Sequence, residues 1–278
     1  MREAEAGESL SEDLATARNA VLEAGTLAMD FKHRGVKVWD KAPGDPVTDA
    51  DIAVNTLLAT RLRDARPDYG WLSEESVPEK DIRSSKRIWL VDPIDGTRAY
   101  MRDDDPHWCI GVAVVENGKA VAGIIYAPEL DALYEARLGG GAYLNGELLQ
   151  ASQVRTEEGC RLITNKGLVQ HPAWREPWPD VIVADPKPNA TLLRLAFIAD
   201  GTWDAALVLF RKSDWDLAAG AILIQEAGGE ATTHLGEPFL FNGPVPAQRS
   251  VIAAGKHLHP LLVRRTQMVA LPNPGEAA

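Results

Sequence analysis

The sequence of 278 residues is poor in cysteine and has no long apolar run. Its two cysteines, Cys109 and Cys160, have neither the number of a disulfide framework nor the spacing of a zinc site, so we expect reduced core thiols. No run reaches the roughly 18 apolar residues that a membrane span needs. Residues 1–14 are polar and acidic, without the apolar region of a secretion signal. These absences predict a cytoplasmic protein with no membrane partner.

Basic charge is also scarce, because 40 aspartates and glutamates outnumber 29 lysines and arginines and give a formal net charge of −11. Such a surface repels nucleic acid polymers and anionic membranes. An anionic small molecule would need a local source of positive charge, and bound metal ions are one candidate. Hydrophobic residues still make up 45 % of the chain, which is enough for a packed core.

Helical periodicity and capping-box spacings predict a helix that starts at Ser9 and covers 14–31, and a second that starts at Thr48 and ends near Arg66. We expect residues 1–8 to form a flexible tail and residues 33–46 to form a loop. Apolar runs predict strands at 88–91, 110–115, 121–126, 133–136 and 141–144. Asn117-Gly118 predicts a hairpin between the second and third of these.

The second half alternates expected strands and helices. The strands are at 161–164, 181–184, 205–210 and 251–254, and the helices are at 191–198, at 216–226 and after residue 254. The pattern favours a layered α/β (α+β) sandwich. We expect an N-terminal α+β half, residues 9–155, and a C-terminal α/β half, residues 156–278.

Acidic residues gather at the ends of the expected elements. Asp92 and Asp95 directly follow a strand, and three more lie at a strand end or a helix start: Asp51, Glu74 and Asp216. Ligand sites in layered α/β folds lie at such places. Aspartates after a strand also cap turns, so this local interpretation of Asp92 and Asp95 stays open.

Clustered carboxylates repel one another unless a cation lies among them. Oxygen ligands without histidine or cysteine suit Mg²⁺, and Mn²⁺ or Ca²⁺ as substitutes in binding. Gly96 allows a ligand to approach the backbone closely, and the successive N–H groups of Gly96 and Thr97 suit a phosphate. The combination indicates metal-assisted hydrolysis of a phosphate ester, in which metal ions activate water and stabilise the leaving oxygen.

The stretch DPIDGT at 92–97 resembles the DP(I/L)DGT signature of the inositol monophosphatase superfamily. Four further stretches agree in order: DPVTDAD at 45–51, LSEES at 72–76, WDLAAG at 215–220 and EAGG at 226–229. The resemblance covers about residues 12–265. The superfamily comprises Mg²⁺-dependent, lithium-sensitive phosphatases, and it includes CysQ-type 3′(2′),5′-bisphosphate nucleotidases and some fructose-1,6-bisphosphatases.

The resemblance implies an αβαβα sandwich and two or three metal ions. Glu74, Asp92 and the carbonyl of Ile94 would hold the first ion, and Asp92, Asp95 and Asp216 the second. Glu74 would hold a weaker third ion through waters.

Three residues would act on the water and the phosphate. Thr97, paired with Asp51, would orient and deprotonate the attacking water. The amides of Gly96 and Thr97 would bind the phosphate.

The substrate is less defined by the resemblance. Leu209 stands where inositol monophosphatases carry a glutamate that binds an inositol hydroxyl, whereas Thr191 could keep a hydroxyl that family members carry there. Arg194 stands at a lysine position of CysQ-type proteins. Arg211 and Lys212 would suit a second phosphate, or they are solvated surface charges.

We therefore expect hydrolysis of a small phosphorylated metabolite, with a bisphosphate nucleotide favoured. The alternatives are inositol 1-phosphate and fructose 1,6-bisphosphate as substrates, or a catalytically silent regulatory homologue. Family members are often dimers, so a homodimer is possible.

Several neighbouring residues keep two interpretations. Lys41 resembles a family lysine near the site, but it also fits a surface lysine. Glu75 is expected behind the metal ligands. Trp174 and Trp178 are expected to serve in packing, although a role in stacking on the substrate stays open.

Overall fold

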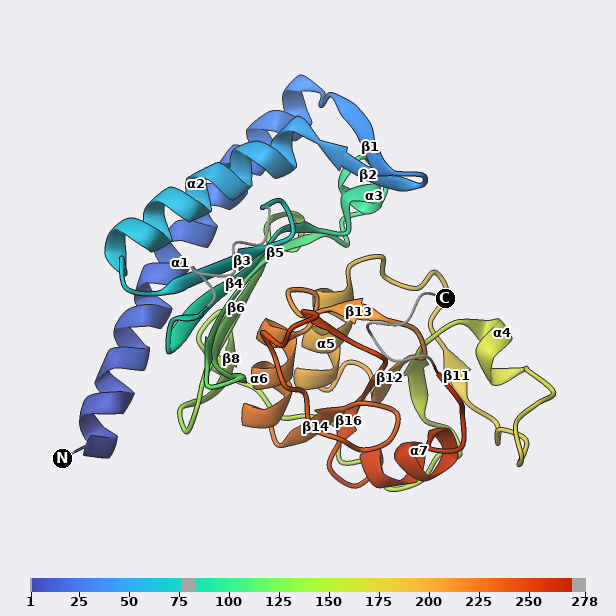
Figure 1. Ribbon diagram of the computed structural model, residues 1–278. Coiled ribbons are helices and arrows are strands. Elements are labelled where there is room, and N and C mark those ends of the chain that lie inside the picture. The colour runs from blue at the N-terminus through green and yellow to red at the C-terminus, as the bar shows by residue number, and fades with distance from the viewer. Residues whose placement is uncertain (1, 77–83, 272–278) are drawn as a thin grey trace.

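The computed structural model describes residues 2–76 and 84–271, with the side chains of the first helix described from Gly7 (Figure 1). In this part of the chain, helices and sheets alternate as five layers. The long pair α1 and α2 covers one face of a seven-stranded sheet, and α5 and α6 cover the other. A five-stranded sheet follows, with α7 on its far face. The predicted αβαβα sandwich is confirmed.

The helices of the described residues range from one turn to nine turns. Their bounds are α1 Arg2–Arg34, α2 Asp49–Ala65, α3 Thr97–Tyr100, α4 Lys166–Val169, α5 Thr191–Ala199, α6 Ala218–Glu226 and α7 His259–Thr266, with a short 3₁₀ turn at Pro128–Leu130. The predicted helices that cover residues 14–31, 49–65 and 191–198 are confirmed.

The larger sheet has the order β3-β4-β5-β6-β7-β8-β9, in which only β3 and β4 are parallel. Its strands are β3 Gly70–Ser73, β4 Arg87–Asp95, β5 Cys109–Glu116, β6 Lys119–Ala127, β7 Ala132–Arg137, β8 Gly141–Leu144 and β9 Glu147–Leu148. The β5–β6 hairpin turns at Asn117 and Gly118, which both have positive φ. The predicted Asn-Gly hairpin is therefore confirmed.

The smaller sheet has the order β11-β10-β12-β16-β14. Its strands are β10 Arg161–Ile163, β11 Ile182–Val183, β12 Ala205–Val208, β14 Gly229–Thr232 and β16 Val251–Gly255. Two short ladders lie outside both sheets: β1 Val38–Ala42 with β2 Asp45–Thr48, and β13 Lys212–Ser213 with β15 Ala247–Gln248.

Strand β4 shows why the apolar run at 88–91 is continuous. Ile88 and Leu90 pack in the cluster that includes α5 and α6, whereas Trp89 and Val91 pack in the cluster that includes α1 and α2. Successive side chains of a strand point to opposite faces. Because helices cover both faces, every position in this run is apolar.

Two segments differ from the sequence-based expectations. Helix α1 begins at Arg2, so residues 2–8 are helical and Ser9 lies inside the helix. The expected loop at 33–46 contains the hairpin β1–β2, which turns at Gly44 with φ +77°. The first residues of the chain are rich in glutamate and alanine, which favour a helix even without an apolar face. All five residues of β1 are exposed, so its sequence has no alternating apolar pattern that would predict a strand.

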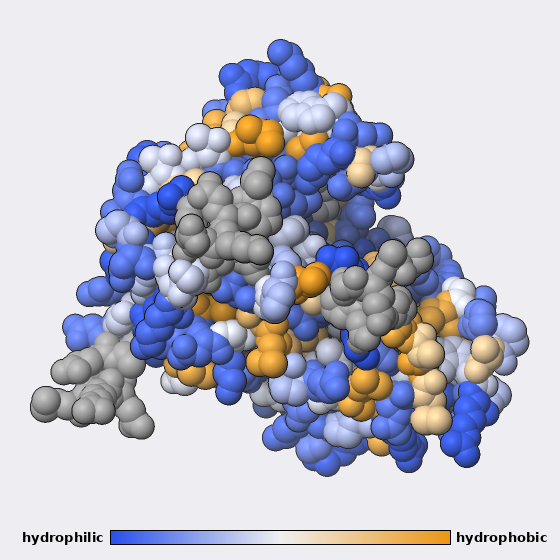
Figure 2. All heavy atoms as spheres, in the orientation of Figure 1, coloured by the Kyte–Doolittle hydropathy of each residue, from blue (hydrophilic) through white to orange (hydrophobic). Residues whose placement is uncertain are grey.

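The two large sheets take their strands from residues 70–148 and 161–255. The core cluster between them includes residues of both parts, such as Ile125 and Leu223. The division into halves at 155/156 stays a prediction. Hydrophilic residues dominate the face of the molecule in Figure 2, with hydrophobic residues scattered among them. In the described residues, no helix combines the length and apolar character needed to cross a bilayer.

Gly123 tests how closely α6 packs on the larger sheet. A Cβ there would lie 2.7 Å from Ile222 Cγ2 and 2.9 Å from Ala219 Cα. We expect Gly123→Ala to lower the free energy of unfolding by about 1–3 kcal/mol, because an overpacked core shifts the helix backbone. Urea unfolding measures this, and Gly167→Ala, where nothing lies within 4 Å of the added Cβ, is the control. Equal effects of the two substitutions would contradict the close packing.

Candidate metal centre

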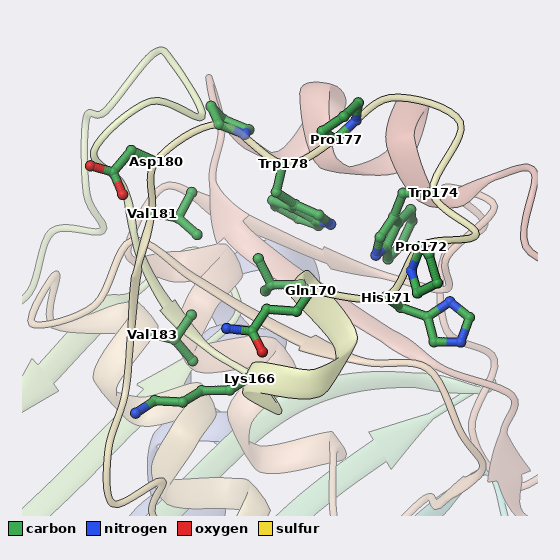
Figure 3. A pocket seen from close by; sticks show the side chains of 12 residues that line it. Lys166, Gln170, His171, Pro172, Trp174, Pro177, Trp178, Asp180, Val181 and Val183 are labelled. Carbon is green, nitrogen blue, oxygen red and sulfur yellow. The ribbon is translucent and has the colours of Figure 1, made fainter.

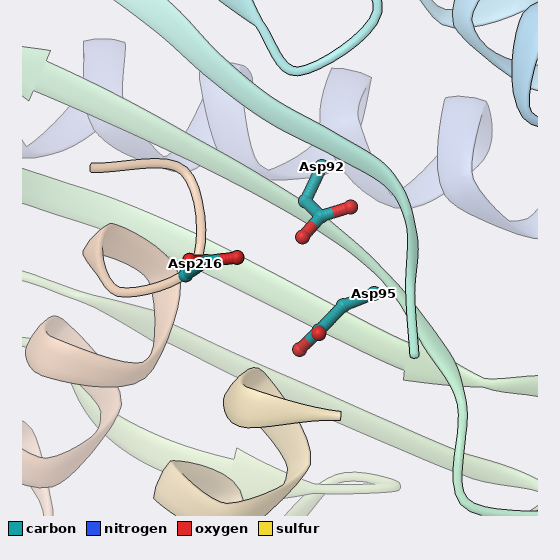
Figure 4. Close-up of side chains that lie close together, drawn as sticks. All are labelled: Asp92, Asp95 and Asp216. Atoms are coloured by element: carbon teal, nitrogen blue, oxygen red, sulfur yellow. The ribbon is translucent and has the colours of Figure 1, made fainter. Parts of the chain in front are cut away.

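Three carboxylates from distant parts of the chain meet between the larger sheet and the start of α6 (Figure 4). Asp92 and Asp95 belong to β4, and Asp216 lies two residues before α6. One oxygen of each lies within 4.8 Å of the others. The cluster agrees with the predicted set for the second metal ion.

A bulge in β4 brings the two aspartates of this strand together. Residues three apart in a regular strand point to opposite faces. Here Asp92 pairs with Gly111 and Asp95 pairs with Cys109, so β4 holds one extra residue between the two pairs. The irregularity turns both carboxylates toward the same side, as bulges near functional sites do. The alternative that these aspartates only cap a turn does not account for Asp216 beside them.

The first turn of α5 lies against the cluster. The backbone N–H of Leu192 donates to Asp95 Oδ2. Gly96 has φ +90°, and a Cβ on it would lie 3.1 Å from both Ala190 Cβ and the His107 carbonyl oxygen. Glycine is required at 96 by its conformation and by this close approach.

Asp92 provides the test of whether a cation fits here. Its side chain is 1 % exposed, and both carboxylate oxygens are buried without a hydrogen-bond partner among the described residues. A buried carboxylate without a partner is strongly unfavourable unless a positive charge or a proton compensates it. The donor set is oxygen only, which suits Mg²⁺. The residues present therefore fit a divalent cation.

Burial and mutual repulsion raise the pKa values of the carboxyl groups at this site. Burial, and then the charge of Glu74, raises the pKa of Asp92 well above its ordinary value. Burial and the charge of Asp216 raise the pKa of Asp95 to about 7. Burial also raises the pKa of Glu74, against the opposing effect of Lys41. A bound cation would reverse all three shifts.

Asp51 and Thr97 lie together, as the resemblance implies. Thr97 Oγ1 is 3.3 Å from Asp51 Oδ1 and 3.2 Å from the carbonyl oxygen of Ile94. The other oxygen of Asp51 accepts bonds from Thr48, at 2.8 Å from its N–H and 2.6 Å from its hydroxyl. These bonds complete the predicted capping box of α2. Burial raises the pKa of Asp51 to about 6.

Lys41 joins the hairpin β1–β2 to the acidic residues. Its Nζ donates to Glu74 Oε1 at 2.8 Å and to Glu75 Oε1 at 2.6 Å. Both glutamates follow β3, and the side chain of Glu75 is only 4 % exposed. Lys41 is therefore an ion-pair partner of Glu74 and not a free surface lysine. Glu75 is the second carboxylate that Lys41 contacts.

The residues predicted to select the substrate differ in their burial and in their contacts with the acidic cluster. Lys212 Nζ lies 3.4 Å from Asp216 Oδ2, whereas Arg211 is exposed. Thr191 is the buried first residue of α5. Arg194 is buried, and its guanidinium donates to the carbonyl oxygens of Pro188 and Asn189. Arg194 holds a loop beside the site and does not present its charge to open solvent.

Leu209 follows β12 and packs against the hydrophobic cluster that includes Leu207 and Leu262.

The sequence-based interpretation missed Lys187. It lies in the loop before α5, between Pro186 and Pro188, and burial together with the charges of Arg194 and Lys212 lowers its pKa. A lone lysine in a loop has no spacing signal. Its position just before Thr191, a residue already assigned to substrate selection, was the available clue.

A cavity of about 520 Å³ is lined by residues between Lys166 and Val183 (Figure 3). Trp174 and Trp178 line it and contact each other edge to face, with ring centroids 5.5 Å apart. Its lining includes none of the three aspartates of the acidic cluster and does not include Thr97. The tryptophans pack with each other, as expected. The two cysteines are buried and free, which confirms the expected thiols.

The fold and the site define the class of this protein. The family model described as the inositol monophosphatase family matches residues 9–270, and the chain belongs to this family. It is therefore a metal-dependent phosphoric monoester hydrolase.

Individual relatives support the family assignment. The chain is 34 % identical over 247 residues to an inositol-1-monophosphatase of Mesorhizobium japonicum, covering 84 % of this chain and 90 % of the relative. It is 31 % identical over 193 residues to a fructose-1,6-bisphosphatase/inositol-1-monophosphatase of Thermotoga maritima, covering 69 % and 73 %. A solved structure of the SuhB protein of Bartonella henselae matches with a TM-score of 0.77 at 28 % identity, covering 92 % of this chain and 98 % of that one.

The names of these relatives favour one of the predicted alternatives. They support an inositol-1-monophosphatase or a fructose-1,6-bisphosphatase better than the CysQ-type nucleotidase that the sequence favoured. The preference for a bisphosphate nucleotide rested on Arg194 at a lysine position of CysQ-type proteins, on Arg211 and Lys212, and on Leu209 in place of a glutamate. In the structure Arg194 binds two backbone carbonyl oxygens and Lys212 lies against Asp216, so these residues do not by themselves define a site for a second phosphate.

We expect the stabilisation by Mg²⁺ to depend on pH. The pKa of Asp95 is near 7 when folded and near 3.8 ordinarily. The folded protein therefore holds this proton at pH 5, and the stability that it contributes is lost as the pH rises through 7. Mg²⁺ must displace the proton. Its apparent affinity should be about 100-fold weaker at pH 5 than at pH 8, which is about 2.7 kcal/mol less stabilisation at saturating metal.

Thermal unfolding with Mg²⁺ and with EDTA at pH 5, 6, 7 and 8 measures this, with K⁺ at equal ionic strength as the control. A Mg²⁺-induced rise in Tm that is equal or larger at pH 5 would contradict the expectation.

Proposed function

We propose that this protein hydrolyses the phosphate ester of a small metabolite with Mg²⁺ bound at the acidic cluster, and that inositol 1-phosphate is the first candidate substrate. The observation that carries the proposal is the buried, unpartnered carboxylate of Asp92 beside Asp95 and Asp216. The names of relatives at 34 % identity support the substrate.

The assignment of ligands is the one that the family resemblance implies, and the grouping of Asp92, Asp95 and Asp216 supports it. Glu74, Asp92 and the carbonyl of Ile94 would hold one ion, and Asp92, Asp95 and Asp216 a second. Glu74 would contribute to a weaker third ion. When bound, the divalent cations supply charge that neutralises the phosphate and lowers the pKa of water.

Asp51 and Thr97 would handle the proton. The hydroxyl of Thr97 is placed to donate to Asp51 and to accept a proton from the attacking water. A base with a pKa of about 6 is suited to this exchange near neutral pH. Thr48 fixes the carboxylate of Asp51 with two bonds, so that its other oxygen faces Thr97. The amides of Gly96 and Thr97 would bind the phosphate oxygens.

A second candidate is a substrate with two phosphates, such as fructose 1,6-bisphosphate. Leu209 lacks the carboxylate that would bind an inositol hydroxyl, which weakens the first candidate. Lys212 Nζ lies 3.4 Å from Asp216 Oδ2 in the acidic cluster, and a relative from Thermotoga maritima bears both activities in its name. A bisphosphate nucleotide of the CysQ type has the same two charges and belongs in the same test.

The decisive experiment measures kcat/KM with Mg²⁺ for inositol 1-phosphate, fructose 1,6-bisphosphate and adenosine 3′,5′-bisphosphate. We expect hydrolysis of at least one, abolished by EDTA and restored by excess Mg²⁺. Asp95→Asn should lower kcat by at least about 10³-fold without unfolding the protein, because it removes charge from the metal centre. The absence of turnover over a wide phosphate panel, with metal bound, would contradict the proposal.

Thr97→Ala separates proton handling from substrate binding. We expect kcat to fall by at least about 10²-fold with little change in KM, because the hydroxyl acts on the water and not on the substrate. Thr97→Ser, which keeps the hydroxyl, is the matched control and should retain most of the activity. An effect of Thr97→Ala on KM alone would refute this role.

A further inference from the structure

Residues 240–248, which end in β15, lie against the segment that carries Asp216 into α6 (Figure 4). In this segment the short strand β13 pairs with β15, with Ser213 opposite Ala247. The backbone N–H of Ser213 donates to Asp216 Oδ2 at 3.1 Å. The direction of the Asp216 carboxylate therefore depends on where the loop 240–248 places the backbone of Ser213.

Asp214 is the buried residue that joins this segment to the loop 240–248. It is 0 % exposed, although it carries a carboxylate. Its Oδ2 accepts the backbone N–H of Asn242 at 2.6 Å, and its Oδ1 accepts the side-chain amide of Gln248 at 2.8 Å. Its own backbone N–H donates to the carbonyl oxygen of Pro246 at 3.0 Å. One residue thus contacts the loop at three positions.

The backbone of Asp214 also closes the turn that contains Asp216. Its carbonyl oxygen accepts the N–H groups of Leu217 and Ala218, at 3.2 and 3.0 Å. Asp216 lies inside this turn, one residue before Leu217. The side chain of Asp214 therefore fixes the position of the turn, and its carbonyl oxygen fixes the shape of the turn.

The loop is in turn attached to the larger sheet. Gln248 Nε2 donates to the carbonyl oxygen of Leu240 at 3.1 Å. The N–H of Phe241 donates to the carbonyl oxygen of Gly118 at 2.9 Å, in the turn between β5 and β6, and Phe241 packs in the core cluster between the sheets. Strand β5 pairs directly with β4, which carries the other two aspartates of the metal cluster. The contacts of Asp214 therefore hold Asp216 in place relative to the same sheet.

The two partners of the Asp214 side chain are both donors, so this position needs two acceptor oxygens. An asparagine has the same shape, but it would turn an NH₂ group toward one of the two donors. A buried donor that loses its acceptor is costly, so the loop or the turn would shift to relieve the contact. Groups that orient a metal ligand influence the affinity of a site for its metal even when they do not touch the ion.

We propose that Asp214 is a positioning residue, which fixes the Asp216 carboxylate in the direction that a divalent cation at the acidic cluster requires. The proposal rests on the function given above, since it assumes that a cation binds there. Asp214 is not one of the three residues whose oxygens meet in the cluster, and both of its own oxygens accept hydrogen bonds. Its effect is therefore on metal affinity, through Asp216.

Calorimetric titration of Mg²⁺ into the metal-free protein tests this role without depending on turnover. We expect Asp214→Asn to raise the Kd for Mg²⁺ at least about tenfold, because substitutions behind metal ligands commonly weaken metal binding by about 10- to 100-fold. Gln248→Leu removes one of the two donors and should raise the Kd by a smaller factor, about threefold.

Asp204 provides a matched control, because it is also a buried aspartate that accepts several hydrogen bonds. It is 2 % exposed, and it accepts the hydroxyl of Ser152 at 2.6 Å and the backbone N–H of Arg161 at 2.7 Å. Asp204→Asn should lower the urea midpoint of unfolding in EDTA and leave the Kd for Mg²⁺ unchanged. The same unfolding curves establish that each variant is folded under the conditions of the titration.

The possible results separate the two proposals. If the wild-type protein binds Mg²⁺ and Asp214→Asn changes the Kd by less than about twofold, the positioning role is overturned and the proposed function stands. Equal weakening by Asp204→Asn would also overturn the role, because general loosening would then be a sufficient cause. If Asp214→Asn does not fold, an unchanged Kd in Gln248→Leu overturns the role. A wild-type protein that binds no Mg²⁺ would reject both proposals.

Discussion

The repulsion among buried carboxylates is the constraint around which this structure is organised. Asp92, Asp95 and Asp216 offer oxygens within 4.8 Å of one another, and no group in the described part of the chain donates a hydrogen bond to the Asp92 carboxylate. Such an arrangement is unfavourable without a cation, so the rest of the fold must supply the free energy that keeps it together. The bulge in β4, the first turn of α5 and the start of α6 all converge on this one place.

The convergence joins the larger sheet to the segment before α6. Two aspartates come from the larger sheet, and the third comes from the segment between the β13 strand and α6. Helices α5 and α6 fill the space between the sheets, so their packing sets the separation of the carboxylates. Gly111 shows how close this packing is, because a Cβ there would lie 2.2 Å from Leu192 Cδ1. Small residues at this contact allow α5 to approach β5 and Asp95 together.

Much of this arrangement could be predicted from the sequence, for reasons that differ between segments. The strand at 88–91 has a continuous apolar run because both faces are covered, and Asn117-Gly118 has the conformation that a tight hairpin needs. The metal-binding residues could be found because DPIDGT combines a bulge, a glycine with positive φ and two carboxylates in six positions. The hairpin β1–β2 could not, since all five residues of β1 are exposed and this strand carries no alternation. Lys187 could not either, because only the folded loop places it beside Arg194 and Lys212.

The carboxylate of Asp51 makes two different contacts, one with each oxygen. One oxygen closes the capping box at the start of α2, and the other faces Thr97. A substitution that altered its basicity would also loosen the first turn of that helix, and a substitution that improved the helix start would displace the oxygen that Thr97 needs. Variation at this position is therefore constrained from two directions, and a laboratory search for thermostable variants should find fewer tolerated changes at Asp51 than its place on a helix end would suggest.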